Sequence, residues 1–234
     1  MIRRFEIYSV QAQAPDRRVL ALETACRRCG QFIPEVLHTA VGWNLSDAPA
    51  ELVWEHAFDS AETYRRYMVH PYHADVLDRY LLPDSPERVV ADNDLRAGLV
   101  GYACDGPVFV MAGGVRRLVL LRVGRDASPT QIDHLVSVLG DAPAEVDDLT
   151  LSVAGANTLG SAWFDAETPI GGRPFWGYLW EQGFRTGDAL DAYLDGPSAL
   201  ALAERREWKG IMDDIVEAAV SVHYVIDAPR PQPG

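Results

Sequence analysis

The sequence has few cysteines, no long apolar run and no concentration of positive charge, and each shortage excludes a class of protein. Only 3 of its 234 residues are cysteine, so a disulfide-stapled secreted domain is not expected. No apolar run approaches the ~20 residues of a membrane span, and the first residues lack the apolar core of a secretion signal. The formal net charge of −13 would repel a phosphate backbone or an anionic lipid surface. We therefore expect a cytoplasmic protein that binds neither nucleic acid nor membranes.

Common metal, phosphate and nucleophile patterns are also missing. Cys26 and Cys29 form a CxxC inside a predicted helix, but no second pair completes four zinc ligands, so we expect reduced thiols. The paired glycines lack the strand and helix that flank a phosphate-binding loop, and no Ser-His-Asp arrangement is readable. The sequence thus predicts neither a metal ion nor another cofactor.

What the chain does contain is an internal repeat. A shift of 113 places residues 2–44 over 115–157 without a gap, and after a 13-residue insertion the register resumes at a shift of 126. The anchoring blocks are Ile2-Arg3-Arg4-Phe5 with Val115-Arg116-Arg117-Leu118, Gly42-Trp43-Asn44 with Gly155-Ala156-Asn157, and Val53-Trp54-Glu55 with Leu179-Trp180-Glu181. Matched blocks in the same order indicate a tandem duplication.

Both copies predict the same order of elements. Strand-like runs are 2–10, 36–46, 51–58 and 97–103 in the first copy, and 115–123, 148–158, 175–185 and 218–226 in the second. Helices are expected at 15–30 and from 60, and at 128–139 and from 187, where a proline interrupts each second helix. The order β-α-β-β-α-β is that of the ferredoxin-like fold, in the α+β class.

We assign residues 1–103 to repeat 1, 104–114 to a linker, 115–227 to repeat 2 and 228–234 to a disordered tail. The insertion at 160–174 could be an ordinary hairpin loop or a lid. A ferredoxin-like sheet carries helices on one face only, so the bare apolar faces of the two copies should bury each other. The sequence therefore predicts an α/β barrel of the dimeric type, formed within one chain that can be a monomer.

A motif in the first copy carries a family resemblance. The segment from Phe58 ends in Tyr67-x-x-His70-Pro71-x-His73, which resembles the hallmark of the stress-responsive dimeric α/β-barrel (Dabb) family. The second copy keeps the tyrosine and the proline but has Gly196 and Ala199 in place of the histidines. Within the family, the first copy resembles polyketide cyclases of the olivetolic acid cyclase type. That resemblance implies intramolecular aldol cyclisation, with His73 as general base and Tyr67 holding or polarising a carbonyl.

The chemistry of these residues is compatible with that role. An imidazole with an ordinary pKa of about 6.5 can accept a proton from an activated carbon near neutral pH. Tyr67 and His73 are six residues apart, which an unbroken helix would place on well-separated sides, but Pro71 interrupts the helix and allows convergence. The alternative for His73 is a partly exposed histidine at a helix start. His70 precedes the proline and is expected to stabilise the turn.

Four further residues are predicted to bind substrate, because they share one strand face: Glu6, Tyr8, Trp54 and His56. Alternation places Arg4 on that face too, with Phe5 and Ile7 on the other. The alternative for Glu6 and His56 is a buried pair within the sheet. A metal site built from Glu6 and the histidines is disfavoured, because His-x-x-His across a proline lacks the spacing of common zinc sites.

The second copy has less ionisable residues at the matching positions. Glu6 corresponds to Val119, Tyr8 to Leu121, and His56 to Gln182. The first copy is therefore the candidate active site and the second a scaffold. Three functions remain open, in this order. The first is a cofactor-independent cyclase or lyase acting on a polyketide or similar small carbonyl compound, the second a non-catalytic stress-associated protein that binds a small ligand, and the third a cofactor-free monooxygenase.

Overall fold

The structure is a computed structural model that describes residues 1–91, 99–104, 113–141, 149–159, 176–195 and 206–230. The first half contains β1 (Ile2–Val10), α1 (Asp16–Phe32), β2 (Val36–Trp43), β3 (Leu52–Phe58), α2 (Ala61–Met68), the π-helix η1 (Tyr72–Leu77), α3 (Asp78–Leu81), β4 (Val90–Ala91) and β5 (Leu99–Ala103). The second half contains β6 (Val115–Val123), α4 (Pro129–Asp141), β7 (Leu149–Ala156), β8 (Tyr178–Phe184), α6 (Gly187–Asp195), α8 (Arg206–Ile215) and β9 (Val216–Val225). Within these ranges no helix is long and apolar enough to cross a membrane.

The two halves have the same sheet topology. In the first, β2, β3 and β1 are neighbours in that order, and β1 also pairs with β5 and, at its end, with β4. In the second, the order is β7-β8-β6-β9, again antiparallel. The registers coincide as well, since Arg3 pairs with Ala57, and Arg116 with Gly183, as the two shifts of the repeat predict. The predicted α+β fold of ferredoxin-like halves is confirmed.

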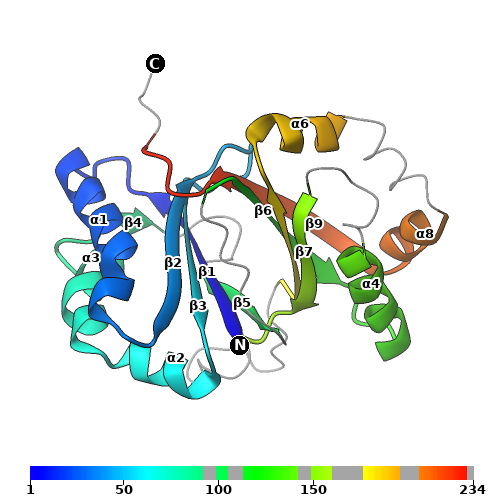
Figure 1. Ribbon diagram of the computed structural model, residues 1–234, viewed down its shortest axis with the longest axis horizontal. Coiled ribbons are helices and arrows are strands. Elements are labelled where there is room, and N and C mark those ends of the chain that lie inside the picture. Colours follow the sequence, from blue (N-terminus) through cyan, green and yellow to red (C-terminus); the bar gives the residue numbers. More distant parts are fainter. Residues whose placement is uncertain (92–98, 105–112, 142–148, 160–175, 196–205, 231–234) are drawn as a thin grey trace.

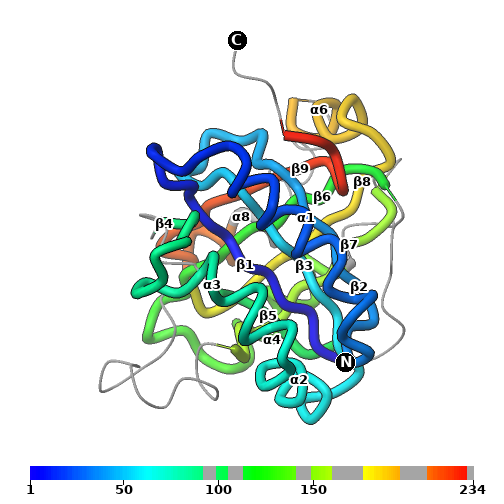
Figure 2. The backbone as a smooth tube through the Cα atoms, turned by 90° about the vertical axis from the view of Figure 1, so that its left-hand side faces the viewer, coloured from blue at the N-terminus to red at the C-terminus, as the bar shows by residue number. Residues whose placement is uncertain are grey.

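The two sheets face each other across an apolar core, and the helices lie outside them (Figure 1). Figure 2 views the molecule from the side on which α1, α2 and α3 cover the first sheet. Phe5 and Ile7 of β1 pack in the core between the sheets with Leu118 and Leu120 of β6. The bare faces thus bury each other, which confirms the barrel within one chain. The boundaries of the repeats stay predictions, because most of the linker and the whole insertion 160–174 lie outside the described residues.

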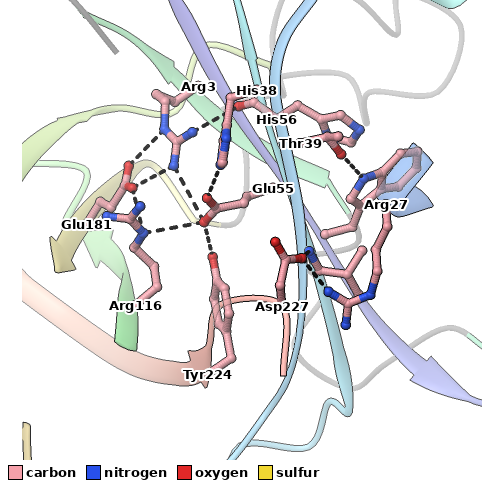
Figure 3. Close-up of polar contacts among 12 residues, drawn as sticks. Arg3, Arg27, His38, Thr39, Glu55, His56, Arg116, Glu181, Tyr224 and Asp227 are labelled. Carbon is pink, nitrogen blue, oxygen red and sulfur yellow. Dashed lines mark hydrogen bonds and ion pairs between the residues drawn. The ribbon is translucent and has the colours of Figure 1, made fainter. Parts of the chain in front are cut away.

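A group of charged side chains lies buried in the middle of this core, and we call it the interior ion cluster (Figure 3). It consists of Arg3, Glu55 and Tyr102 from the first half and Arg116, Glu181 and Tyr224 from the second. Arg3 Nη2 lies 2.7 Å from Glu181 Oε1, and Arg116 Nε lies 3.4 Å from Glu55 Oε2 and 3.2 Å from Glu181 Oε1. The cluster therefore joins the two halves by charge as well as by apolar contact.

Part of the predicted tail contacts the first half. Arg27 of α1 pairs with Asp227 and donates a hydrogen bond to the Ala228 carbonyl oxygen at 2.9 Å. The Arg230 guanidinium lies 5.0 Å from the centre of the Trp43 ring and 2.8 Å from the Asp16 carboxylate. Side chains of α1 and β2 thus contact residues 228–230, while the disordered tail stays a prediction and 231–234 lie outside the described residues.

One close contact between the halves predicts a destabilising substitution. A Cβ atom at Gly42 in β2 would lie 2.2 Å from Tyr224 Cδ2 and 2.8 Å from Tyr224 Cβ, so the ring could not swing aside without moving β9. We expect Gly42→Ala to lower the free energy of unfolding by about 1–3 kcal/mol, as overpacked cores do.

The matched control for Gly42 is Gly30→Ala. Gly30 lies inside α1 with its nearest neighbours at 3.6 Å, so an added methyl group meets ordinary contacts. Alanine there should stabilise the helix by up to about 1 kcal/mol. Urea unfolding of both variants measures the difference, and equal effects of the two substitutions would contradict the contact.

Candidate active site

The helix that carries the Tyr-x-x-His-Pro-x-His motif is interrupted where the proline predicts. α2 ends three residues before Pro71, and the chain resumes as the π-helix η1, in which the Asp78 amide donates to the His73 carbonyl oxygen. Single π turns are uncommon and are often found at functional sites. The interruption turns His73 back toward Tyr67, and their ring centres lie 4.5 Å apart. The structure therefore brings together the two residues predicted to be catalytic.

Strands β1 and β3 form the floor beneath Tyr67. The ring of His56 lies 5.5 Å from that of Tyr67, and the Arg4 guanidinium lies 5.2 Å from the Tyr67 ring centre. Arg4 Nη2 is 2.6 Å from the Glu6 carboxylate. These four residues and His73 are all buried, and the most exposed of them, Arg4, has only 4% of its surface accessible. We call Arg4, Glu6, His56, Tyr67 and His73 the polar cluster.

The polar cluster is unusual because several of its buried polar atoms make no hydrogen bond of ordinary geometry in the described part of the chain. These atoms are Nε and Nη1 of Arg4, both ring nitrogens of His56, the Tyr67 hydroxyl and Nδ1 of His73. A buried polar group without a partner costs about 1–3 kcal/mol, so such groups are rare unless a ligand or water completes them. The polar cluster thus has open hydrogen-bonding capacity within the described residues.

The second half provides an internal comparison. Arg117, Gln182 and Tyr193 occupy the positions of Arg4, His56 and Tyr67. There Arg117 Nη1 donates to Gln182 Oε1 at 2.5 Å, and Gln182 Nε2 donates to the Tyr193 hydroxyl at 3.2 Å. In the second half these side chains therefore bond to one another, with only Nε of Arg117 left without a partner among the described residues, whereas in the first half the ring nitrogens of His56 and two nitrogens of Arg4 lack partners.

Burial and Arg4 set the charges of the polar cluster. Burial, reinforced by the Arg4 cation, lowers the pKa of His73 to about 3 and holds the pKa of His56 well below its ordinary value. Burial also raises the pKa of the Tyr67 phenol. For Glu6, burial outweighs the attraction of Arg4 and raises the pKa to about 7. Near neutral pH the site therefore contains one guanidinium cation, a carboxyl group that is only partly ionised, two neutral imidazoles and a protonated phenol.

The structure decides between several alternatives for the predicted site residues. The partly exposed histidine considered for His73 is wrong, because only 3% of its surface is accessible. The buried pair of Glu6 with His56 is also wrong, since the carboxylate pairs with Arg4. His70 Nδ1 accepts a hydrogen bond from the Tyr72 amide at 3.1 Å, in the turn where it was expected.

The other predicted residues contribute mainly to packing. Trp54 contacts the His56 ring, with 3.9 Å between ring centres, but its Nε1 donates to the Thr39 hydroxyl at 2.8 Å. Tyr8 is partly exposed and packs at the rim of the same core. Cys26 and Cys29 are free thiols buried in α1, and burial raises the pKa of both. In the described ranges no three His, Cys, Asp or Glu residues are grouped so as to hold a metal ion.

Sequence reasoning missed two members of the site. Strand alternation placed Arg4 on the same face as Glu6, but nothing in the sequence indicated that its guanidinium would lie beside Tyr67. Asp78 lies five residues after His73, and its carboxylate is 3.6 Å from His73 Nδ1. In an α-helix that spacing would separate the two side chains by about 140°, so only the π turn brings them together.

Comparison with known proteins agrees with this architecture. Residues 2–94 match the model of the stress responsive A/B barrel domain family. No curated protein matches the sequence. A candidate monooxygenase from Fusobacterium nucleatum has a similar solved structure, with 8% identity, a TM-score of 0.62, and coverage of 100% of this chain and 95% of that one.

Two further solved structures are similar over most of the chain. One is an anthrone oxidase-like protein, with 13% identity, a TM-score of 0.61, and coverage of 96% of this chain and 90% of the other. The second is a candidate monooxygenase from Lactobacillus acidophilus, with 11% identity, a TM-score of 0.56, and coverage of 97% and 94%. At these identities the likeness shows the fold. Residues 2–94, which match the stress responsive A/B barrel domain model, include the Tyr-His-Pro motif, and the sheet topology of the first half agrees with that match.

Proposed function

We propose that the polar cluster is the active site of a monooxygenase that acts on an acidic carbon or phenol of an electron-rich aromatic compound. The observation that carries the proposal is the convergence of unpartnered buried polar atoms on Tyr67, His56 and His73. The likeness over the whole chain to candidate monooxygenases and to an anthrone oxidase-like protein supports oxidation as the reaction. The predicted absence of a cofactor is retained in this proposal.

The reaction balances with oxygen as the sole co-reactant. In an anthrone, the CH₂ group loses a proton, and the carbanion adds O₂ to give a hydroperoxide after protonation. Loss of the second C–H proton and cleavage of the O–O bond then give the ketone and one water molecule. The substrate carbon supplies all four electrons that reduce O₂, one oxygen atom entering the ketone and the other leaving as water.

His73 is proposed to accept the first proton, because its imidazole is neutral and its Nδ1 makes no hydrogen bond of ordinary geometry, with the Asp78 carboxylate 3.6 Å away. Its low pKa makes it a weak base in the empty site, but a substrate anion forming beside it would stabilise the imidazolium. The protonated Tyr67 hydroxyl is proposed to donate to the substrate carbonyl oxygen.

Cyclisation, which the sequence favoured, would begin with the same deprotonation, and the carbanion would then attack a carbonyl of its own chain. The comparisons bring no support for that second step, so we place oxidation first. A protein that binds a ligand without chemistry would show the same unpartnered atoms. Oxygen uptake distinguishes these alternatives.

Oxygen consumption with anthrone tests the proposal. After subtraction of the uncatalysed rate, the protein should accelerate oxygen uptake and form anthraquinone in equal amount. His73→Gln and Tyr67→Phe should each lower the rate by about 100-fold or more, as expected for loss of a general acid or base. Tyr193→Phe removes the matching hydroxyl from the second half and should retain the rate. The proposal fails if no oxygen uptake depends on the protein, or if all three variants retain it.

A further inference from the structure

We infer that Arg4 is the receptor for an oxyanion of the ligand, so that the first half selects planar compounds bearing an enolate, phenolate or carboxylate oxygen. The inference rests on the proposed function for the nature of the substrate. It concerns recognition, however, and can be tested without turnover. A site for such an anion follows from the position of Arg4, the state of its donors and the contrast with the second half.

Arg4 is a buried cation with most of its donors unused. Its side chain comes from the middle of the first sheet, with 4% of the residue accessible. Glu6 takes Nη2, while Nε and Nη1 bond to nothing in the described ranges, which leaves three of the five N–H donors of a guanidinium open. The guanidinium carbon lies 5.3 Å and 5.2 Å from the ring centres of Tyr64 and Tyr67. The aromatic rings hold the cation in place but cannot accept hydrogen bonds as an oxyanion does.

The surroundings of Arg4 favour an anion over a neutral acceptor. His56, Tyr67 and His73 present neutral groups near neutral pH, so none of them brings a negative charge to the cation, although the Tyr67 hydroxyl interacts with it. A guanidinium binds a carboxylate or similar oxyanion through short, charge-assisted hydrogen bonds, about twice as strong as neutral ones. The negative charge in contact with Arg4 is the Glu6 carboxylate. The charge of Asp78, on the helix side, helps to raise the pKa of Glu6. A ligand anion would displace this carboxylate, which can take up a proton as the ligand binds.

The duplication provides an internal comparison for Arg4, because the second half has an arginine, Arg117, at the equivalent position. Arg117 donates to Gln182, which in turn bonds to Tyr193. Val119 stands at the position equivalent to Glu6, so Arg117 has no carboxylate partner there. Within the described residues Nε lacks a partner in both arginines, but Nη1 is paired in Arg117 and unpartnered in Arg4. Arg4 lies next to the residues proposed to be catalytic.

Binding of a matched pair of probes tests the inference. Anthracene-9-carboxylate and anthracene-9-methanol share a planar three-ring body but differ in charge, and both can be titrated by their fluorescence at pH 7.5. The wild-type protein should bind the carboxylate at least about tenfold more tightly than the alcohol, the difference that one charge-assisted contact makes. Arg4→Gln should abolish this preference, and Arg117→Gln should keep it.

Three outcomes of this experiment would overturn the inference. Equal binding of the two probes by the wild-type protein, no binding of the carboxylate, or a preference that survives Arg4→Gln would all exclude Arg4 as the receptor. Circular dichroism verifies the fold of the variants. If Arg4→Gln does not fold, Arg4→Lys decides instead, because it keeps the charge with fewer donors and should lower the preference without changing the affinity for the alcohol. A preference that depends on Arg4 without oxidation of anthrone would retain the anion site and refute the proposed function.

Discussion

Replacing Glu55 by glutamine is expected to lower the free energy of unfolding by about 3–5 kcal/mol, the usual cost of removing one partner from a buried ion pair. Glu55 has no accessible surface, and it accepts a hydrogen bond from Tyr224 at 2.6 Å. Arg3 and Arg116 carry two positive charges that Glu55 and Glu181 balance. Glutamine keeps the volume of the side chain, so the variant isolates the loss of one charge and leaves a buried guanidinium uncompensated.

The lowered pKa of Glu55 also indicates that its negative charge is stabilised in the folded protein. Burial alone would raise it, but Arg116 and Arg3, with a hydrogen bond from His38, hold the pKa of this carboxyl well below its ordinary value. Urea unfolding at pH 7.5 measures the effect. The matched control is Glu62→Gln, where a 63% exposed side chain pairs with Arg65 and the expected change is within about 0.5 kcal/mol. A loss below about 1 kcal/mol for Glu55→Gln would show that the interior ion cluster does not hold the halves together.

The second large effect is a loss of stability in acid that depends on His73. The folded protein lowers the pKa of this imidazole from 6.5 to about 3. Between these pH values His73 is protonated in the unfolded chain but not in the folded protein, so the free energy of unfolding falls as the pH falls. The contribution of His73 is complete above about pH 6.5 and is lost toward pH 3, at up to about 1.4 kcal/mol per pH unit.

Unfolding by urea at pH 7, 6, 5 and 4 tests this linkage. His73→Gln should flatten the pH dependence by about 1.4 kcal/mol per unit in this range, and His56, whose pKa is also lowered, should account for part of the slope that remains. Leu77→Ala is the control, because it removes a fully buried, non-ionisable side chain from the same π-helix and should destabilise equally at each pH. An unchanged slope in His73→Gln would mean that this imidazole is not held neutral.

Much of the architecture could be predicted from local and repeated patterns. Alternation along β1 put Phe5 and Glu6 on opposite faces, because successive side chains of a strand point to opposite faces, and the structure places Phe5 in the core between the sheets. The shifts of 113 and 126 predicted which residues of the two halves are equivalent, and the strand registers agree. The roles of the site residues remain predictions.

The sequence by itself therefore determined the duplication, the faces of the strands and the break at Pro71. Only the tertiary structure decided which side chains meet. Glu6 pairs with Arg4 rather than His56, Asp78 reaches His73 through a π turn, and Glu55 meets Arg116 across the barrel. Periodicity is a property of one segment, whereas these partners depend on how two sheets and an irregular helix dock. The difference between Arg4, whose Nη1 lacks a partner among the described residues, and Arg117, whose Nη1 bonds to Gln182, is for that reason visible only once both halves are folded.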